Sequence, residues 1–518
     1  MARETSPLLE NADPIEAETS PETPLLSASG EDAAKHPRYP SAILIAFAIC
    51  FLADAGASLL GVPEVRAFEM AVCRDYYVEH DPTVIGEPPW SYVDESLCKL
   101  RGIQTRMAYL RATKGLIMTI PGKECGPMCL SPRFSEQTLT IEGILLTFPY
   151  GYLSDRVGRK LVVFLSLFGQ ILEMFATIGI LYFHRTFSTN MVLLTPIFRI
   201  IGGGNRVLVA SLSSIVVDTV PPSMRPTLFY VTGAGLLITE TVMVPIGSQL
   251  LLKDLWLAFK VAMPILLASL VLVGVLPETH DPKHSSGDGT DDLSVDSSDT
   301  NKPFLHMLLR RGANNVKKAG QGLRGLPKGA KVTLSIIFIS KFARECSSLF
   351  VQYASKVLHW PIANAGYVIS VKSFISLVLL ILLAGMSTAA SRRGEAATLL
   401  LNRRVVILSL AMLALGAVLV GLSINAATLV VGSVFESTGY GIGQALQGTL
   451  ASFANPSSTG ELFAGAALIE LLAGLSGTFA FAGLFDLGLQ SRFPRGVGLP
   501  YFVAAILYAI AVIESLSL

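Results

Sequence analysis

The chain has 518 residues, of which 51% are hydrophobic and only 15% are charged, and its formal net charge is +1. Soluble globular domains carry about 25% charged residues, so this composition excludes an ordinary soluble domain. The near-zero net charge argues against nucleic acid or a strongly acidic macromolecule as a partner. The apolar residues fall in blocks long enough to cross the roughly 30 Å hydrocarbon core of a bilayer as helices, which predicts a multi-pass membrane protein.

Residues 1–40 precede the first apolar block and are rich in Pro, Glu, Ser and Thr. A segment with so few bulky apolar side chains cannot bury a core, so we expect a disordered cytoplasmic tail. We expect no cleavable signal peptide, because the first apolar block is too long and begins too far into the chain. The stretch "ETSPLL" has the Glu-x-x-x-Leu-Leu form that sorting adaptors bind, which makes the vacuolar membrane an alternative to the expected plasma membrane.

Twelve apolar blocks follow, six on each side of a polar linker. They cover residues 42–62, a second block ending at 153, 161–183, 191–217, 227–252, 255–276, 332–353, 362–386, 405–424, 427–453, 462–484 and 497–513. This pattern predicts an all-α membrane protein of twelve transmembrane helices in two six-helix bundles. The bundles are expected at 41–276 and 332–516, with a long outer loop at 63–135 and a cytoplasmic linker at 277–331.

Lysine and arginine gather in the loops after the second, fourth, sixth and eighth blocks, which places both termini in the cytoplasm by the positive-inside rule. The basic half of the linker, 303–331, is expected to lie on the anionic inner leaflet. On the outer, oxidising side, Cys73 and Cys98 are candidates for a disulfide. Cys125 and Cys129 lack the second Cys/His pair of a zinc site, and no Walker loop occurs, so neither a metal nor a cofactor is expected.

A polar passage, 123–143, interrupts the second apolar block. Its removal would join "LIMTIPG" to "ILLTFPYGYL" as one 17-residue span, and the Gly-Lys pair at the junction is one that a splice donor can encode. We therefore hypothesise an unspliced intron translated in frame. The alternative is a genuine outer-loop insertion, with a short second span beginning near Leu139 and containing Glu142.

The stretch "GYLSDRVGRK" (151–160) interrupts the apolar chain with charge and glycine. A tight cytoplasmic turn explains the glycines, and basic residues alone would fit a positive-inside anchor. The full string resembles the G-x-L-a-D-r-x-G-r-k signature of the major facilitator superfamily, which governs alternating access at the cytoplasmic side. The positions that match, together with two further residues in "VVDTVPPSMRPTLFY", form the expected gating motif: Gly151, Asp155, Arg156, Gly158, Arg159, Lys160, Asp218 and Arg225.

Other stretches carry the same resemblance. "FRIIGGGNRV" resembles the family's R-x-x-q-G element, with Arg199 in the arginine position and Gly202 in place of the usual polar residue. "VQYASKVLHW" (351–360) and "GLPYFVAAILY" (498–508) look like a fungal branch related to the proton-coupled folate transporters. The resemblance implies two rocking six-helix bundles with a substrate cavity between them at mid-membrane. It does not name a substrate.

Ionisable residues inside the spans are the candidates for substrate or proton handling, because each is costly in hydrocarbon. They are Asp54, Glu173, Arg199, Arg206 and Glu240 in the first half, and Lys341, Arg344, Glu345, Lys372, Glu436 and Glu470 in the second. Each has a structural alternative as an ion pair, and Lys341 with Glu345, four residues apart, has the spacing of a helical pair. Arg199 and Arg206 share one helix face, where they can hold an anion or pair with Glu240 or Asp54.

We expect a secondary transporter of a small organic molecule, working as a monomer with protons as the coupling ion, and no enzyme, since no reactive constellation occurs. The span "GAGLLITETVMVPIGSQ" keeps much of the Gly-Pro motif of exporting antiporters, although Val244 stands where a glycine usually precedes Pro245. This favours efflux of a secondary metabolite. Proton-coupled uptake of an organic anion or nutrient, and a non-transporting nutrient sensor, are the alternatives.

Overall fold

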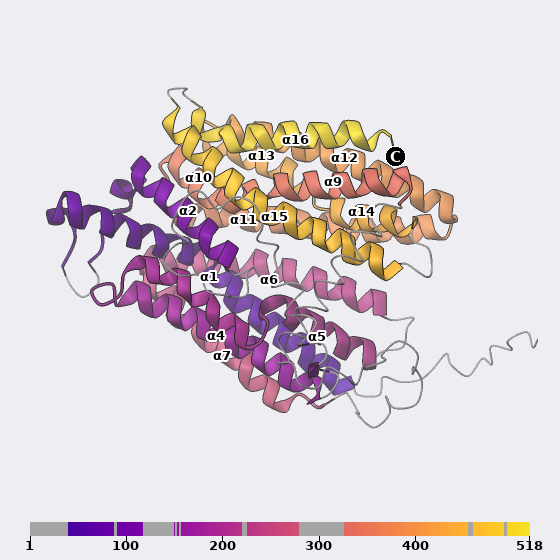
Figure 1. Ribbon diagram of the computed structural model, residues 1–518, viewed down its shortest axis with the longest axis horizontal. Coiled ribbons are helices and arrows are strands. Elements are labelled where there is room, and N and C mark those ends of the chain that lie inside the picture. The colour runs from indigo at the N-terminus through magenta and orange to yellow at the C-terminus, as the bar shows by residue number, and fades with distance from the viewer. Residues whose placement is uncertain are drawn as a thin grey trace, which may run out of the picture.

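A computed structural model gives the arrangement of the chain. It describes residues 40–87, 91–117, 150, 153–154, 157–219, 225–278, 326–453, 459–491 and 495–517. Nearly all of the predicted tail at 1–40, the passage 123–143 and most of the linker at 277–331 lie outside the described residues. Figure 1 shows two helical bundles side by side, the indigo-to-magenta helices below and the orange-to-yellow helices above. This arrangement confirms the predicted all-α fold.

In the described part of the chain, the N-terminal bundle has seven longer helical elements. They are α1 (Pro40–His80), α2 (Arg101–Ile117), α4 (Arg159–Tyr182), η6 (Thr189–Ile201), α5 (Gly204–Thr219), α6 (Arg225–Lys253) and α7 (Leu255–Val275). Two short 3-10 helices, η2 (Pro82–Val84) and η3 (Glu95–Lys99), lie between α1 and α2. The predicted spans at 161–183, 227–252 and 255–276 agree with α4, α6 and α7 to within a few residues.

The C-terminal bundle follows the same plan. It contains α9 (Lys328–Arg344), η7 (Glu345–Leu349), α10 (Phe350–Leu358), α11 (Ile362–Ser391), α12 (Glu395–Gly421), α13 (Ala426–Thr438), α14 (Ile442–Ala451), α15 (Thr459–Gln490), η8 (Gly496–Gly498) and α16 (Leu499–Ser515). In the described part of the chain, eight helices are long and apolar enough to cross a membrane. The predicted spans 191–217, 332–353 and 427–453 each consist of consecutive shorter pieces instead of one helix.

Helix α1 is longer than predicted. It has 41 residues and continues to His80, so the prediction that an outer loop begins at residue 63 was wrong. At 1.5 Å per residue it is about 60 Å long, roughly twice the thickness of the hydrocarbon core. Hydropathy missed its second part because 63–80 carries charged side chains, among them Glu69 and Arg74, which are buried in the folded chain.

Helix α2 is a second correction to the predicted loop at 63–135. It lies wholly within that range, yet it packs against α1, η6 and α15 among the spanning helices. Its sequence contains three arginines and a lysine, so its hydropathy is low. The second crossing therefore begins near Arg101, well before the 144–153 stretch that the sequence marked as apolar.

The two bundles share part of their core where they meet. The large C-terminal cluster of buried apolar side chains also includes Val62, Met107 and Val244 from the N-terminal bundle. Helices α6 and α11 approach closely there: a Cβ on Gly366 would overlap the Ser248 hydroxyl, and Ser370 donates a hydrogen bond to the Thr241 carbonyl. Small residues permit this kind of close helix contact in membrane proteins. The seam between α6 and α11 is thus a packed surface.

Candidate functional site

A charged cluster lies inside the N-terminal bundle around Glu173, which is 1% exposed. Its carboxylate oxygens lie 2.9 Å from Lys114 Nζ of α2 and 3.3 Å from a guanidinium nitrogen of Arg199 on η6. Lys114 Nζ is also 3.0 Å from Glu64 of α1. Two carboxylates thus face two cations, which is the arrangement that a low-dielectric interior requires. The cluster ties four helical elements together and gives the predicted candidate Arg199 a partner.

Glycines fix the position of Arg199. The run Gly202–Gly204 ends η6 and starts α5, and Gly203 has a φ of +74°, a conformation that side chains with a Cβ rarely adopt. A Cβ on Gly202 would overlap the α4 backbone at Leu165, and the Ser166 hydroxyl donates a 2.6 Å hydrogen bond to the Gly202 carbonyl. The glycine that replaces the family's polar residue at 202 therefore allows α4 and η6 to touch, two turns from Glu173.

A second group of polar side chains lies between the two bundles. The guanidinium of Arg344, at the end of α9, is 5.6 Å from the ring centroid of Tyr440 in the turn between α13 and α14. Glu240 of α6 lies within electrostatic range of both Tyr440 and Asp54 of α1. We call Asp54, Glu240, Arg344 and Tyr440 the seam group. It consists of two acidic side chains of one bundle and a cation with its aromatic partner in the other.

Asp54 has a feature that the other acidic candidates lack among the described residues. Its side chain hydrogen-bonds to Ser58, but its Oδ2 atom is buried without a hydrogen-bond partner. An unsatisfied buried carboxylate oxygen is energetically costly. Asp54 is therefore placed to bind a proton or a cationic group, and Glu240 lies within electrostatic range of it.

Four of the remaining candidates of the C-terminal bundle form ion pairs. Lys372 of α11 lies 2.7 Å from Glu436 of α13, which also accepts a 3.1 Å hydrogen bond from Ser347. Lys341 lies 3.1 Å from Glu345, one turn further along the chain. Thr478 of α15 donates a 3.2 Å hydrogen bond to the same Glu345 carboxylate. The pairing of Lys341 with Glu345 agrees with the structural alternative that their spacing predicts.

The gating motif is described in part. Gly158 precedes α4 with a φ of +116°, and the backbone N–H groups of Arg159 and Lys160 donate 2.9 and 3.2 Å hydrogen bonds to the Glu278 carboxylate. Lys160 Nζ also donates a 2.6 Å hydrogen bond to the Gly274 carbonyl at the end of α7. A carboxylate at the first turn of a helix satisfies free N–H groups and the helix dipole. The motif thus fastens α4 to the end of α7 within one bundle.

Several predicted residues are not placed in full. Gly151, Asp155 and Arg156 lie outside the described residues, and Arg206, Asp218 and Arg225 are in helices whose side chains at those positions are not described. Glu470 is half-buried on α15. The functional roles of these residues remain predictions from the sequence.

Lys114, Glu64, Glu278 and Tyr440 were not predicted. Lys114 and Glu64 fell inside the expected outer loop, and Glu278 inside the expected linker. The sequence does contain a signal that Lys114 lies at a span, because "ATKGLIMTI" leads directly from the lysine into an apolar run. Tyr440 lies within a predicted span but is not ionised at neutral pH, so a search for charges passes over it.

The outer end of the molecule carries the predicted disulfide, which joins Cys73 of α1 to Cys98 of η3 and is confirmed. We call this end of the bundles the outer end, following the orientation expected from the basic loops. Within the described residues no group of three or more His, Cys, Asp or Glu side chains is placed to hold a metal ion.

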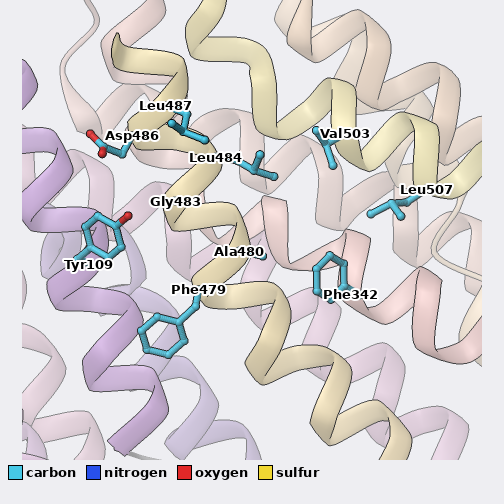
Figure 2. A pocket seen from close by; sticks show the side chains of 10 residues that line it. All are labelled: Tyr109, Phe342, Phe479, Ala480, Gly483, Leu484, Asp486, Leu487, Val503 and Leu507. Atoms are coloured by element: carbon cyan, nitrogen blue, oxygen red, sulfur yellow. The ribbon is translucent and has the colours of Figure 1, made fainter. Parts of the chain in front are cut away.

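A hollow of about 580 Å³ lies apart from these charged groups. Figure 2 shows the lining along α15, with Tyr109 of α2 on one side of this helix and Phe342, Val503 and Leu507 on the other. Its lining is mostly apolar, and Asp486 is its one charged side chain. Because the ionisable candidates lie elsewhere, we place the candidate site at the seam group and not in this hollow.

Comparison with known proteins gives a consistent result. The family model of the Major Facilitator Superfamily matches residues 138–478. The MFS efflux pump atnC of Emericella nidulans is 27% identical over 501 residues, covering 92% of this chain and 90% of that protein. The efflux pump ustT of Aspergillus flavus is 23% identical, covering 87% of this chain and 83% of that protein.

Solved structures share the fold at low identity. The human organic anion transporter MFSD10 (TETRAN) has a TM-score of 0.53 at 16% identity, covering 93% of this chain and 100% of that chain. A POT family transporter in complex with 5-aminolevulinic acid has a TM-score of 0.58 at 12% identity, covering 93% of this chain and 95% of that chain. At these identities the likeness concerns the fold alone.

Proposed function

This chain belongs to the Major Facilitator Superfamily, and from that membership we propose that it exports a small organic metabolite by alternating access, with protons as the coupling ion. Transport by this superfamily uses two bundles that rock around a site between them. The proposal therefore places cargo and proton binding at the seam group, the polar side chains that lie between the bundles.

The observation that carries the proposal is the uneven charge pairing. Glu173 and Glu436 each lie within ion-pair distance of a cation of their own bundle. Asp54 and Glu240 instead have no ion pair with a cation among the described residues, they influence each other electrostatically, and one oxygen of Asp54 is buried without a hydrogen bond. Like charges in proximity favour binding of a proton or a cation. We infer that these two carboxyl groups exchange protons during the cycle, and that Arg344 and Tyr440 contact the cargo from the opposite bundle.

Export is favoured over uptake by two observations. Both fungal relatives described above are named efflux pumps, and each matches this chain over most of its length. In addition, α6 carries most of the Gly-Pro motif of exporting antiporters, with Pro245 inside the helix. The resemblance of 351–360 and 498–508 to the proton-coupled folate transporters supports protons as the coupling ion, but it also keeps uptake as the alternative direction.

The direct test compares the small molecules of a host strain with and without the gene, in cells and in medium, at two external pH values. Export predicts a compound that accumulates inside the deletion strain and is missing from its medium. A compound left unconsumed in the medium, more so at acid pH, would instead establish proton-coupled uptake. A strain whose metabolites are unchanged but which fails to respond to a nutrient would favour the sensor alternative.

Once the compound is known, proton coupling is tested with Asp54→Asn and Glu240→Gln. Both variants should lose the dependence of transport on the pH gradient while the protein still reaches the membrane. Asp75→Asn is the matched control, since Asp75 lies at the outer end and pairs with Arg106 at 3.2 Å. Unchanged pH dependence in Asp54→Asn and Glu240→Gln would remove the two carboxyl groups from the coupling step. A fluorescent fusion tests the proposed plasma-membrane location against the vacuole.

A further inference from the structure

A short segment at the outer end connects the two bundles. We call residues 91–100, which include η3, the outer lid. Contacts with the N-terminal bundle hold it in place: the disulfide from Cys98 to Cys73, a 3.1 Å hydrogen bond from Arg66 to the Val93 carbonyl, one of 3.2 Å from Tyr77 to the Leu97 carbonyl, and one from Tyr92 to Asp254. With a covalent bond among these contacts, the outer lid is a fixed part of the N-terminal bundle.

The outer lid also binds the C-terminal bundle through two side chains. Glu95 accepts a 2.6 Å hydrogen bond from the backbone N–H of Ile362, the first residue of α11. The residue before α11 is Pro361, which provides no side-chain cap. Lys99 donates a 2.6 Å hydrogen bond to the hydroxyl of Ser355 on α10. Glu95 thus satisfies the start of a helix in the opposite bundle, where the helix dipole favours a negative charge.

The charges of these two side chains are balanced inside the N-terminal bundle. Lys99 Nζ lies 2.8 Å from Glu69 and 3.0 Å from Glu95, and Arg66 lies 2.8 Å from Glu69. If the C-terminal bundle moved away, Lys99 would keep both carboxylates and lose the Ser355 hydroxyl, together with the hydrogen bond that its carbonyl accepts from Lys356 Nζ. Separation of the outer lid from the C-terminal bundle therefore breaks hydrogen bonds and a helix cap, but it leaves no buried charge without its partner. Breaking a buried ion pair would be far more costly.

We propose that the outer lid is the latch of the outer side: the contacts of Glu95 and Lys99 with α11 and α10 hold the outer end closed, and they break when it opens. The lid stays on the N-terminal bundle in both states. This inference rests on the alternating-access transport proposed above, but it does not depend on the cargo or on the direction of transport.

The latch is tested by measuring access to Ala363, which is 2% exposed and lines the same outer hollow as Glu95. Ala363→Cys is introduced into a chain whose cysteines other than the disulfide pair are replaced by serine. Whole cells are then treated with a membrane-impermeant maleimide, and the labelling rate is followed. The rate reports how often the outer end opens.

Glu95→Ala should raise the labelling rate by roughly two- to thirtyfold, the range expected when a helix loses a side-chain cap. Ser355→Ala, which removes the contact from the opposite bundle, should raise it by a smaller factor. Asp75→Asn is the matched control, because the Asp75–Arg106 pair is also at the outer end but lies wholly within the N-terminal bundle. Its labelling rate should equal that of the parent.

Wild-type labelling rates in both Glu95→Ala and Ser355→Ala, in protein that elutes as a single species, would overturn the latch. An equal acceleration in Asp75→Asn would also overturn it, since the effect would then be general loosening of the outer end. If Glu95→Ala fails to reach the membrane, Ser355→Ala decides alone, because it removes only one hydroxyl. The assay needs no cargo, so a failed metabolite comparison and a failed latch are separate results.

Discussion

The two lysine–glutamate pairs of the C-terminal bundle provide a sharp prediction, because they have similar distances but different burial. In the first pair the Lys372 and Glu436 side chains are 19% and 5% exposed. In the second, Lys341 and Glu345 are 40% and 19% exposed. Removing one partner of a buried pair costs about 3–5 kcal/mol, whereas a helical pair open to solvent contributes about 0.3–0.5 kcal/mol.

Lys372→Met should therefore destabilise the protein far more than Lys341→Met. With a shift of roughly 2–4 °C per kcal/mol for a unit of this size, the expected fall in melting temperature is on the order of 10 °C for Lys372→Met and about 1–2 °C for Lys341→Met. The measurement is thermal unfolding of purified protein in detergent, followed by the fraction that remains monodisperse. The double variant Lys372→Met with Glu436→Leu should recover most of the loss, because no buried charge is left alone. Equal losses in the two lysine variants would refute the claim that burial sets the cost.

Three further predictions concern other parts of the chain. Asp155→Asn should impair transport and leave membrane insertion intact, which flux and surface-expression measurements would check together; wild-type flux would remove Asp155 from the gating motif. Cys73→Ser should lower stability by about 3 kcal/mol, since the disulfide closes a loop of 25 residues, and thermal unfolding should show it only under non-reducing conditions. Sequencing the transcript across codons 115–150 should reveal a form without 123–143, and its absence from every transcript would end the intron hypothesis.

The predictable part of this fold is the part that hydropathy reports directly. Helices α4, α7 and α16 are mostly apolar and carry few charged residues, so their spans follow from composition alone. The extension of α1 and the whole of α2 were missed because their charges are neutralised by partners distant in sequence. Lys114 of α2, for example, meets Glu64 fifty residues earlier and Glu173 on α4. A hydropathy window averages the values of single residues, so it cannot detect pairs of this kind.

The candidate site was predictable in kind but not in arrangement. Asp54, Glu240 and Arg344 stand out in the sequence because charge is rare inside spans. Which of them pair is a property of packing: Lys341 with Glu345 follows from helical spacing, whereas Lys372 with Glu436 joins α11 to α13 across sixty-four residues. Glu278 illustrates the same limit, because its role depends on α4 starting beside the end of α7.

The internal pairing of charge has a consequence for how the protein responds to voltage. A unit charge that crosses the whole membrane gains or loses about 2.3 kcal/mol per 100 mV. Glu173 with Lys114, and Glu436 with Lys372, travel inside their own bundles as neutral units, so their displacement transfers no net charge across the bilayer. Under the proposed proton coupling, the dependence of the cycle on membrane potential would come from the charge of the cargo and from the protons bound by the carboxyls of the seam group.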